Sequence, residues 1–327
     1  MRIAVLDDYQ RVTEGTEPIQ RLRSRPDVEL AVFHEPLVPG KARAEALRGV
    51  EVVLPIRERT VFDVAFFGDA PDLRLIAQSG NITVHIDRAA AKAASVRIAL
   101  GQAGGVGGGN PAAELAMGLI LSVLRRIPES DRVMRSGRWD QLSGLTLYGM
   151  TLGLVGLGRV GTATARLASA FGMRLITWSR NMTPERAAAV GATAVGLDEL
   201  LQTADVVSIH LALTPETRGM IAERTLRLMR PGAFLVNTAR GAIVDEAALV
   251  RMLQEGAISG AGLDVFGEEP LPAESPLIGL NNVVLTAHIG YPVDTFYAGW
   301  ARATVQRVEE YLAGTLTNVL DLEVQQA

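Results

Sequence analysis

The chain has 327 residues, of which 48% are hydrophobic and 21% charged, as expected for a soluble globular protein with two ordinary domains or one large one. It contains no cysteine, which excludes disulfides, thiolate metal sites and cysteine nucleophiles, and we expect no metal site. The formal net charge of -4 argues against a nucleic-acid binder, and the lack of a long apolar stretch argues against a membrane span. The N-terminus does not have the pattern of a signal peptide, so we expect a cytoplasmic protein.

In the first third of the chain, short β-branched runs alternate with helical patterns, which is typical of βαβ units and a parallel sheet. The helical patterns include residues 41–47 and 87–94. Strands are predicted at residues 3–6, 29–33, 52–54, 73–77 and 97–99.

Residues 101–110 read GQAGGVGGGN and are too rich in glycine for the interior of a helix or a strand. The segment is either a flexible crossover or a hinge that borders a cleft. We interpret it as a hinge or linker without chemistry of its own. Pro111 suits the first turn of a helix, and the apolar pattern of residues 112–126 predicts a well-buried helix there.

From residue 150 the alternation of strands and helices resumes, so a second parallel sheet is predicted. A last helical pattern covers residues 293–312. The predicted strands are 151–155, 174–178, 205–209, 233–237, 260–265 and 283–286.

The first strand of this second sheet leads into the glycine-rich turn GLGRVG at residues 156–161, which opens a helical pattern. Gly156 permits a tight turn, Gly158 lets a pyrophosphate approach the backbone, and Gly161 allows close packing of helix on strand. The free N–H groups of the helix N-terminus would bind the phosphates. A lone GxGxxG is a weak signal, but the strand before it and the helix after it favour a dinucleotide site over purely structural glycines.

The second strand of such a domain usually ends in an acid that binds the ribose 2′-hydroxyl of NAD. Here Ser179 and Arg180 follow the strand, so no carboxylate repels a 2′-phosphate, and a hydroxyl and a guanidinium could bind it. The alternative is an exposed loop arginine without a special role. We favour NADP as the cofactor, with NAD as the second choice.

Three polar segments follow later strands, where ligands of open α/β sheets bind, and they contain Arg240, Glu269 and His288. Hydride transfer to a 2-keto acid needs a cation for the carboxylate, a proton donor for the forming alkoxide, and a group that keeps the donor charged. Each residue also has a structural interpretation, as a capping arginine, a loop acid and a strand-end histidine. Their shared position beside a nucleotide turn favours catalysis.

At these positions the chain resembles the D-isomer-specific 2-hydroxyacid dehydrogenases. The resemblance is carried by four motifs in order, and fainter similarity extends over nearly the whole chain. The motifs are GLGRVG at 156–161, NTARG at 237–241, LDVFGEEP at 263–270 and TAHIG at 286–290.

The resemblance implies that Arg240 binds the substrate carboxylate and 2-oxygen, that His288 is the acid/base, and that Glu269 keeps His288 protonated through a hydrogen bond. The backbone of Ser79, Gly80 and Asn81 would form the other wall of the substrate site. Asp264 would approach the nicotinamide amide. The implied cofactor-binding residues are Gly156, Gly158, Arg159, Val160, Gly161, Ser179, Arg180, His210, Leu211, Thr238, Ala239, Asp264 and Gly290.

The family also implies an α/β fold in which a Rossmann-type doubly wound parallel sheet domain is inserted in a second, smaller flavodoxin-like α/β substrate domain. Residues 1–104 and 293–327 would form the substrate domain, and residues 105–292 the dinucleotide-binding domain. A homodimer built partly around the helix at 112–126 is expected.

The leading hypothesis is an enzyme that transfers a hydride between NAD(P)H and a small 2-keto or 2-hydroxy acid, such as glyoxylate, hydroxypyruvate or a phosphorylated relative. The loops around 55–60, 80–85 and 101–110 would select the acid. His85 is expected to be a solvated loop histidine outside the site. One alternative is a nucleotide-sensing interaction protein, similar to corepressors of this family. Another is oxidation of formate or phosphite, although Glu269 argues against a formate-type site.

Overall fold

The computed structural model describes residues 1–81, 83–101 and 110–322. The chain divides into two compact units, Met1–Gly109 with Pro292–Ala327, and Asn110–Tyr291. The second unit is thus inserted in the chain of the first. The expected domain boundary between residues 104 and 105, and the interior of the hinge predicted at 101–110, lie outside the described residues.

The first unit contains a five-stranded parallel sheet with the order β2-β1-β3-β4-β5. This is the flavodoxin-like strand order. Its helices are α1 (Glu17–Arg23), α2 (Lys41–Ala46), α3 (Val64–Asp69), α4 (Arg88–Ala93) and α12 (Asp294–Leu312). Its strands are β1 (Arg2–Leu6), β2 (Glu29–Val32), β3 (Val50–Pro55), β4 (Leu75–Gln78) and β5 (Arg97–Leu100).

Alternate residues of these strands enter two hydrophobic clusters, one shared with α1 and α12 and the other with α3 and α4. Trp300 of α12 is fully buried, and its Nε1 donates a hydrogen bond to the carbonyl oxygen of Pro55 at 2.8 Å. The end of the chain is therefore an integral part of the unit that its beginning forms.

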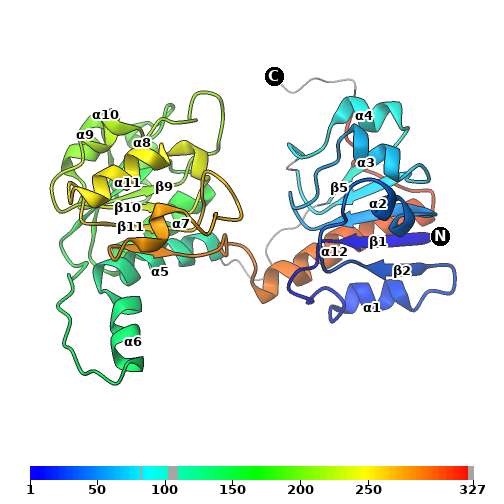
Figure 1. The fold of residues 1–327 in the computed structure, drawn as a ribbon. Coiled ribbons are helices and arrows are strands. Elements are labelled where there is room, and N and C mark those ends of the chain that lie inside the picture. Colours follow the sequence, from blue (N-terminus) through cyan, green and yellow to red (C-terminus); the bar gives the residue numbers. More distant parts are fainter. Residues whose placement is uncertain (82, 102–109, 323–327) are drawn as a thin grey trace. The chain divides into compact units, whose positions relative to one another are not determined.

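The second unit contains a seven-stranded parallel sheet with the order β12-β11-β10-β9-β6-β7-β8. Figure 1 labels β9, β10 and β11 of this sheet. From β8 to β11 this is the doubly wound Rossmann order, extended by one strand. The strands are β6 (Thr151–Val155), β7 (Arg174–Trp178), β8 (Ala192–Ala194), β9 (Val206–Ile209), β10 (Phe234–Asn237), β11 (Gly260–Leu263) and β12 (Val283–Leu285).

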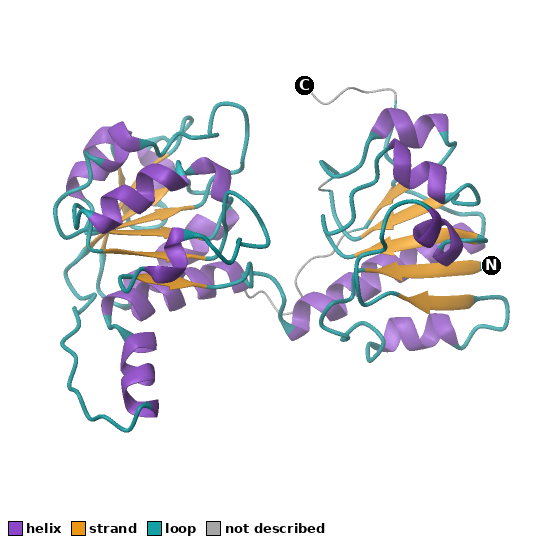
Figure 2. Ribbon diagram, viewed as in Figure 1, coloured by secondary structure: helices purple, strands orange, loops and turns teal. Residues whose placement is uncertain are grey.

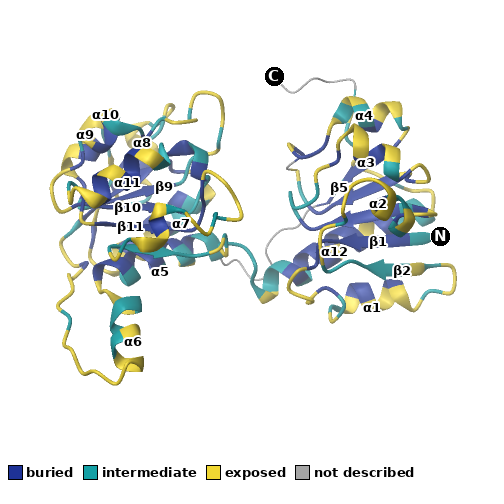
Figure 3. Ribbon diagram, in the orientation of Figure 1, coloured by how far each residue is buried: buried dark blue, intermediate teal, exposed yellow. Residues whose placement is uncertain are grey.

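Helices cover both faces of this sheet (Figure 2), so its central strands β6, β9, β10 and β11 are buried throughout (Figure 3). The helices are α5 (Pro111–Leu124), α6 (Ile127–Arg135), α7 (Arg159–Ala170), α8 (Pro184–Ala188), α9 (Leu197–Thr203), α10 (Glu223–Leu226) and α11 (Glu246–Gln254), with short 3₁₀ turns at η1 (Gly241–Ile243) and η2 (Pro276–Gly279).

Helix α5 shows why the sequence forms a helix at this place. The side chain of Asn110 accepts a hydrogen bond from the amide of Ala113, and Pro111 occupies the first turn. Half of the residues of α5 are buried, which confirms the predicted buried helix. Helix α6 has no buried residue and projects from the unit together with the extended segment that follows it (Figures 1 and 3).

The predicted fold class is confirmed, and each predicted strand is present with ends that differ by a few residues. Strand β8 and helices α1, α3, α6, α8, α9, α10 and α11 were not predicted individually. No helix in the described part of the chain is both long and apolar enough to cross a membrane.

Candidate active site

The turn after β6 has the geometry of a dinucleotide-binding turn. Gly156 has a φ of 106°, which only glycine adopts readily. A Cβ on Gly161 would lie 2.2 Å from the carbonyl oxygen of Gly156, so helix α7 could not pack this closely with a larger residue. A Cβ on Gly158 would meet no atom within 4 Å. Gly156 is therefore required by its backbone conformation and Gly161 by packing, whereas the space beside Gly158 is open.

That space lies at the N-terminus of α7, where Gly158 is the N-cap and makes no side-chain capping bond. The amides of Arg159, Val160 and Gly161 have no acceptor within the helix, as in the first turn of any α-helix. They are suitable donors for phosphate oxygens. The residues present therefore fit the pyrophosphate of a dinucleotide.

Two buried polar atoms near the strand ends have hydrogen-bonding capacity that a bound cofactor could use. Within the described chain, Nδ1 of His210 and Oγ1 of Thr238 are buried without a hydrogen-bond partner. His210 follows β9 and contacts the turn, because a Cβ on Gly156 would lie 2.9 Å from its carbonyl group. Its Nε2 is 3.0 Å from Oγ of Ser208, and burial lowers the pKa of His210 to about 4. The imidazole is therefore neutral near pH 7.

Ser179 and Arg180 follow β7, as the sequence predicted. The Arg180 side chain is 66% exposed, and its Nη2 lies 3.7 Å from Oε2 of Glu216. A hydrogen bond from the Thr214 hydroxyl holds the pKa of Glu216 below its usual value, and the charge of Arg180 adds to this effect. The guanidinium is accessible, but a carboxylate from another loop stands beside it.

The three predicted catalytic residues all belong to the second unit, and two of them are in direct contact. Nδ1 of His288 lies 2.7 Å from Oε2 of Glu269, and both side chains are about one third exposed. The other oxygen of Glu269 accepts a hydrogen bond from the amide of Phe266 at 2.9 Å. Burial by itself raises the pKa of Glu269, but the hydrogen bonds from His288 and Phe266 outweigh it, and the charge of Arg240 adds to them. The net effect holds the pKa below its usual value.

Because the carboxylate of Glu269 is ionised, it can only accept a hydrogen bond. Nδ1 of His288 must then carry a proton, and Nε2 is the ring nitrogen left for a ligand. Such a pair can hold and release a proton at one defined atom.

Asp264 ties the segment that carries His288 to the end of β11. Its carboxylate is buried and accepts hydrogen bonds from the Thr286 hydroxyl at 2.7 Å and from the amides of Ile289 at 2.8 Å and Gly290 at 3.0 Å. Burial raises the pKa of Asp264, while these hydrogen bonds oppose the rise. Both oxygens are used within the loop, and the expected approach of Asp264 to a nicotinamide amide stays a prediction.

Asn237, which the sequence analysis did not single out, fixes the turn that carries Arg240. Its Oδ1 accepts a hydrogen bond from the amide of Ala239, and its Nδ2 donates one to the carbonyl oxygen of Arg240, both at 3.0 Å. Nη1 of Arg240 in turn donates to the carbonyl oxygen of Ala239 at 2.7 Å. Asn237 is the last residue of β10, and an asparagine where a strand gives way to a turn is a known turn-forming signal, so this role could have been predicted.

The residues expected to form the other substrate wall belong to the first unit. Ser79 is buried, Gly80 is half-buried and Asn81 is exposed, directly after β4. The expectation that His85 is solvated is wrong. It is 8% exposed, both ring nitrogens are buried without a partner among the described residues, and burial lowers the pKa of the imidazole.

A glycine-rich turn on a doubly wound sheet, with a histidine–carboxylate pair and an arginine on neighbouring strand ends, defines a nucleotide-dependent oxidoreductase. Comparison with known proteins specifies the family. The family described as "D-isomer specific 2-hydroxyacid dehydrogenase, NAD binding domain" matches residues 117–290. The chain belongs to this family.

Relatives and solved structures agree with this assignment. A glyoxylate reductase of Thermococcus litoralis is 38% identical over 300 residues, which cover 88% of each chain. A D-3-phosphoglycerate dehydrogenase of Mycobacterium tuberculosis is 39% identical over 239 residues, 72% of this chain and 44% of that protein. The crystal structure of a phosphoglycerate oxidoreductase of Vibrio cholerae has a TM-score of 0.86 at 32% identity and covers 96% of this chain and 99% of that one.

The protein is therefore an enzyme that transfers a hydride between a nicotinamide cofactor and a 2-hydroxy or 2-keto acid. The alternative of a nucleotide-sensing interaction protein is not favoured, because these relatives are named as reductases and dehydrogenases.

Proposed function

We propose that the enzyme reduces a small 2-keto acid of the glyoxylate or hydroxypyruvate type, with Arg240, Glu269 and His288 as its chemical residues. The observation that carries the proposal is the 2.7 Å contact between Nδ1 of His288 and the ionised carboxylate of Glu269. The sequence similarity to a glyoxylate reductase supports this substrate class.

In this mechanism the guanidinium of Arg240 donates hydrogen bonds to the substrate carboxylate and to the 2-oxygen, which it polarises. A reduced nicotinamide cofactor held at the turn of residues 156–161 would supply the hydride for C2. Nε2 of His288 donates its proton to the carbonyl oxygen as that oxygen becomes a hydroxyl. Glu269 stabilises the charged imidazolium before the transfer and orients the ring throughout. The role of Ser79, Gly80 and Asn81 in binding the substrate stays a prediction.

The test is a panel of 2-keto acids with NADPH and NADH, monitored by loss of cofactor absorbance. His288→Ala should lower kcat by about a hundredfold or more, as the loss of a general acid does. Arg240→Ala should also raise KM for the keto acid. Arg224→Ala, on an exposed ion pair with Asp198, is the control and should leave both constants unchanged. Near-normal kinetics in both site variants would reject these roles.

We propose NADP as the preferred cofactor, bound at its 2′-phosphate by Ser179 and Arg180. The proposal is supported by the exposed guanidinium of Arg180 and by the lack of an acid at residues 179–181. Arg180→Ala should raise KM for NADPH by about tenfold, typical of a lost charge-assisted hydrogen bond, and leave NADH unaffected. Glu216→Gln removes the negative charge beside Arg180 and should therefore favour NADPH further. A preference for NADH in the unmodified enzyme would contradict the assignment.

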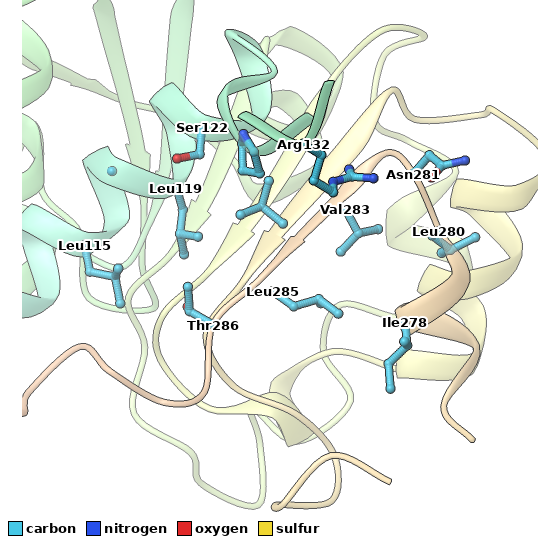
Figure 4. A pocket seen from close by; sticks show the side chains of 13 residues that line it. Leu115, Leu119, Ser122, Arg132, Ile278, Leu280, Asn281, Val283, Leu285 and Thr286 are labelled. Atoms are coloured by element: carbon cyan, nitrogen blue, oxygen red, sulfur yellow. The ribbon is translucent and has the colours of Figure 1, made fainter. Parts of the chain in front are cut away.

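We propose that two copies associate through the face formed by α5, α6 and β12. This face contains a hollow of about 630 Å³ (Figure 4), lined by Leu115 and Leu119 of α5, Arg132 of α6 and Val283 and Leu285 of β12. The segment after α6 exposes 77% of Trp139 and 79% of Tyr148. Large exposed aromatic side chains of this kind are typical of interfaces.

Gly118 of α5 also lines the hollow, and a Cβ on it would meet no atom within 4 Å. Gly118→Arg should therefore fold normally but prevent association. Light scattering coupled to size-exclusion chromatography should give a dimer for the unmodified chain and a monomer for the variant. Gly68→Arg, at an equally open position on α3, is the control. A monomeric unmodified chain would contradict the proposal.

A further inference from the structure

Two turns of the second unit carry the proposed catalytic residues and lie directly against each other. The turn after β10 carries Arg240, and the turn after β11 carries Glu269. A Cβ on Gly241 would lie 1.9 Å from the carbonyl oxygen of Phe266, so the two backbones are in contact. The orientation of one turn therefore depends on that of the other.

The side chain of Glu246 bonds to the turn that carries Glu269. Glu246 is the first residue of α11, five residues after Gly241. Its Oε2 accepts a hydrogen bond from the amide of Gly267 at 2.9 Å. This amide is adjacent to that of Phe266, which donates to Glu269. Two neighbouring amides of the turn are thus held by two carboxylates, one of them the partner of His288.

Helix α11 gives Glu246 a rigid base. Asp245 caps the helix by accepting a hydrogen bond from the amide of Ala248, and its own amide donates to the carbonyl oxygen of Ile221. Five residues of the helix are buried in the hydrophobic cluster of the second unit: Ala248, Leu249, Val250, Met252 and Leu253. The backbone of Glu246 therefore has a fixed position relative to the sheet, and its carboxylate bonds to the Glu269 turn from there.

We propose that Glu246 is a positioning residue of the catalytic site, which holds the Glu269 turn against the Arg240 turn so that Glu269 meets Nδ1 of His288. This inference rests on the proposed function of Arg240, Glu269 and His288. Without Glu246 the amide of Gly267 would turn to solvent, and the Glu269 carboxylate would no longer be held toward His288.

The test compares three variants of the enzyme. Glu246→Ala removes the acceptor and should lower kcat by about ten- to a hundredfold, as a small misplacement of a catalytic group does, with little change in KM for the cofactor. Glu246→Gln keeps a carbonyl oxygen that can accept the same hydrogen bond and should retain most of kcat. Glu255→Ala is the control. Glu255 lies just past the other end of α11 in a surface ion pair with Arg227, so its removal takes away the same charge and should leave the kinetics unchanged.

A double-mutant cycle distinguishes positioning through Glu269 from a general loss of structure. In a Glu269→Gln background, Glu246→Ala should lower kcat by much less than it does alone, because its effect is transmitted through Glu269. The pH profile of kcat/KM should also shift in Glu246→Ala and not in Glu255→Ala.

Unchanged kcat in Glu246→Ala, or additive effects of the two substitutions, would overturn the inference. An equal loss of kcat in Glu246→Gln and Glu246→Ala, in parallel with a lower melting temperature, would overturn it as well. These results would leave the proposed function standing, which is tested separately by His288→Ala and Arg240→Ala.

Discussion

His288 adopts a backbone conformation that requires support from its surroundings. Its φ of 53° lies in the left-handed region, which costs a non-glycine residue about 1–2 kcal/mol. Such strained residues persist only where neighbouring interactions fix them, and they are frequent at functional sites. Asp264 supplies that support, because it binds the residues on both sides of His288.

Asp264→Asn should therefore weaken both the fold and the catalytic site. One carboxylate oxygen is replaced by an NH₂ group, which leaves a backbone amide of the loop without an acceptor at a cost of about 1–3 kcal/mol. Urea unfolding should show this loss, and kcat should fall because His288 is no longer fixed. Asp198→Asn, on the exposed surface of α9, is the control. Unchanged kcat and stability would show that the loop does not depend on Asp264.

His210 should make the stability of the protein depend on pH. Its pKa of about 4 in the folded state is below the value of 6.5 for a free imidazole. Between these values the unfolded state binds a proton that the folded state does not, so the contribution of His210 to stability is complete above pH 6.5. It is lost as the pH falls toward 4, by an amount on the order of 3 kcal/mol.

This prediction is tested by urea unfolding at several pH values between 4 and 7.5 in the unmodified protein and in His210→Gln. The difference between the two isolates His210 from the other groups that titrate in this range. The unmodified protein should lose more stability than the variant on acidification. Parallel curves would show that the imidazole is not held neutral by burial.

At the scale of single residues, the sequence identified the candidate catalytic residues but not all of the residues that hold them in place. Arg240, Glu269 and His288 each follow an apolar strand, so their common location could be predicted from strand order and resemblance. Their catalytic roles stay predictions. The contact between Glu246 and Gly267 joins residues 21 positions apart and depends on how α11 packs beside the next strand. No local pattern in the sequence indicates it.

Two matched glycine substitutions in the turn between β6 and α7 can separate the packing of helix α7 from the binding of the cofactor. Gly161→Ala places a Cβ 2.2 Å from the carbonyl oxygen of Gly156 and should lower the free energy of unfolding by about 1–3 kcal/mol, as overpacking does. Gly158→Ala meets no protein atom within 4 Å and should affect stability less. It would, however, fill the space where the pyrophosphate is expected.

We therefore expect Gly158→Ala to weaken cofactor binding more than stability, and Gly161→Ala to do the reverse at temperatures where it remains folded. Thermal melting and fluorescence titration with NADPH measure the two effects. Equal NADPH affinity in Gly158→Ala and the unmodified protein would mean that the phosphates do not approach this turn.

The sequence predicted the bounds of β6 and β7 to the residue, and those of β10 to within one residue. β6 and β10 are buried at every residue, and their β-branched and aliphatic runs have sharp ends. β8 has only three residues, one of them buried, and α8 has five residues, so neither produces a detectable period. Such short elements are specified by packing on their neighbours more than by their own sequence.

At the scale of the whole molecule, each unit has its own hydrophobic interior. Two clusters consist of residues from the unit of β1–β5, and two consist of residues from the unit of β6–β12. The alternation of strands and helices predicts parallel sheets, but it does not by itself fix the order of the strands or which strands share a sheet. For that reason the resemblance to a family was needed to predict that one unit is inserted in the other.

Because all the expected cofactor residues belong to the second unit, the cofactor should stabilise that unit selectively. At a concentration a hundred times its Kd, a ligand that binds only the folded state stabilises it by about 2.7 kcal/mol. Hydrogen–deuterium exchange of the full chain with and without NADPH should show slower exchange for β6, α7 and β9. Amides of β1 and β3, whose exchange requires opening of the other unit, should change little. The Gly158→Ala variant at the same NADPH concentration is the control and shows how much of the protection requires binding at the turn. Equal protection of both sheets in the unmodified protein would contradict selective stabilisation, because it would mean that the two sheets open as one cooperative structure.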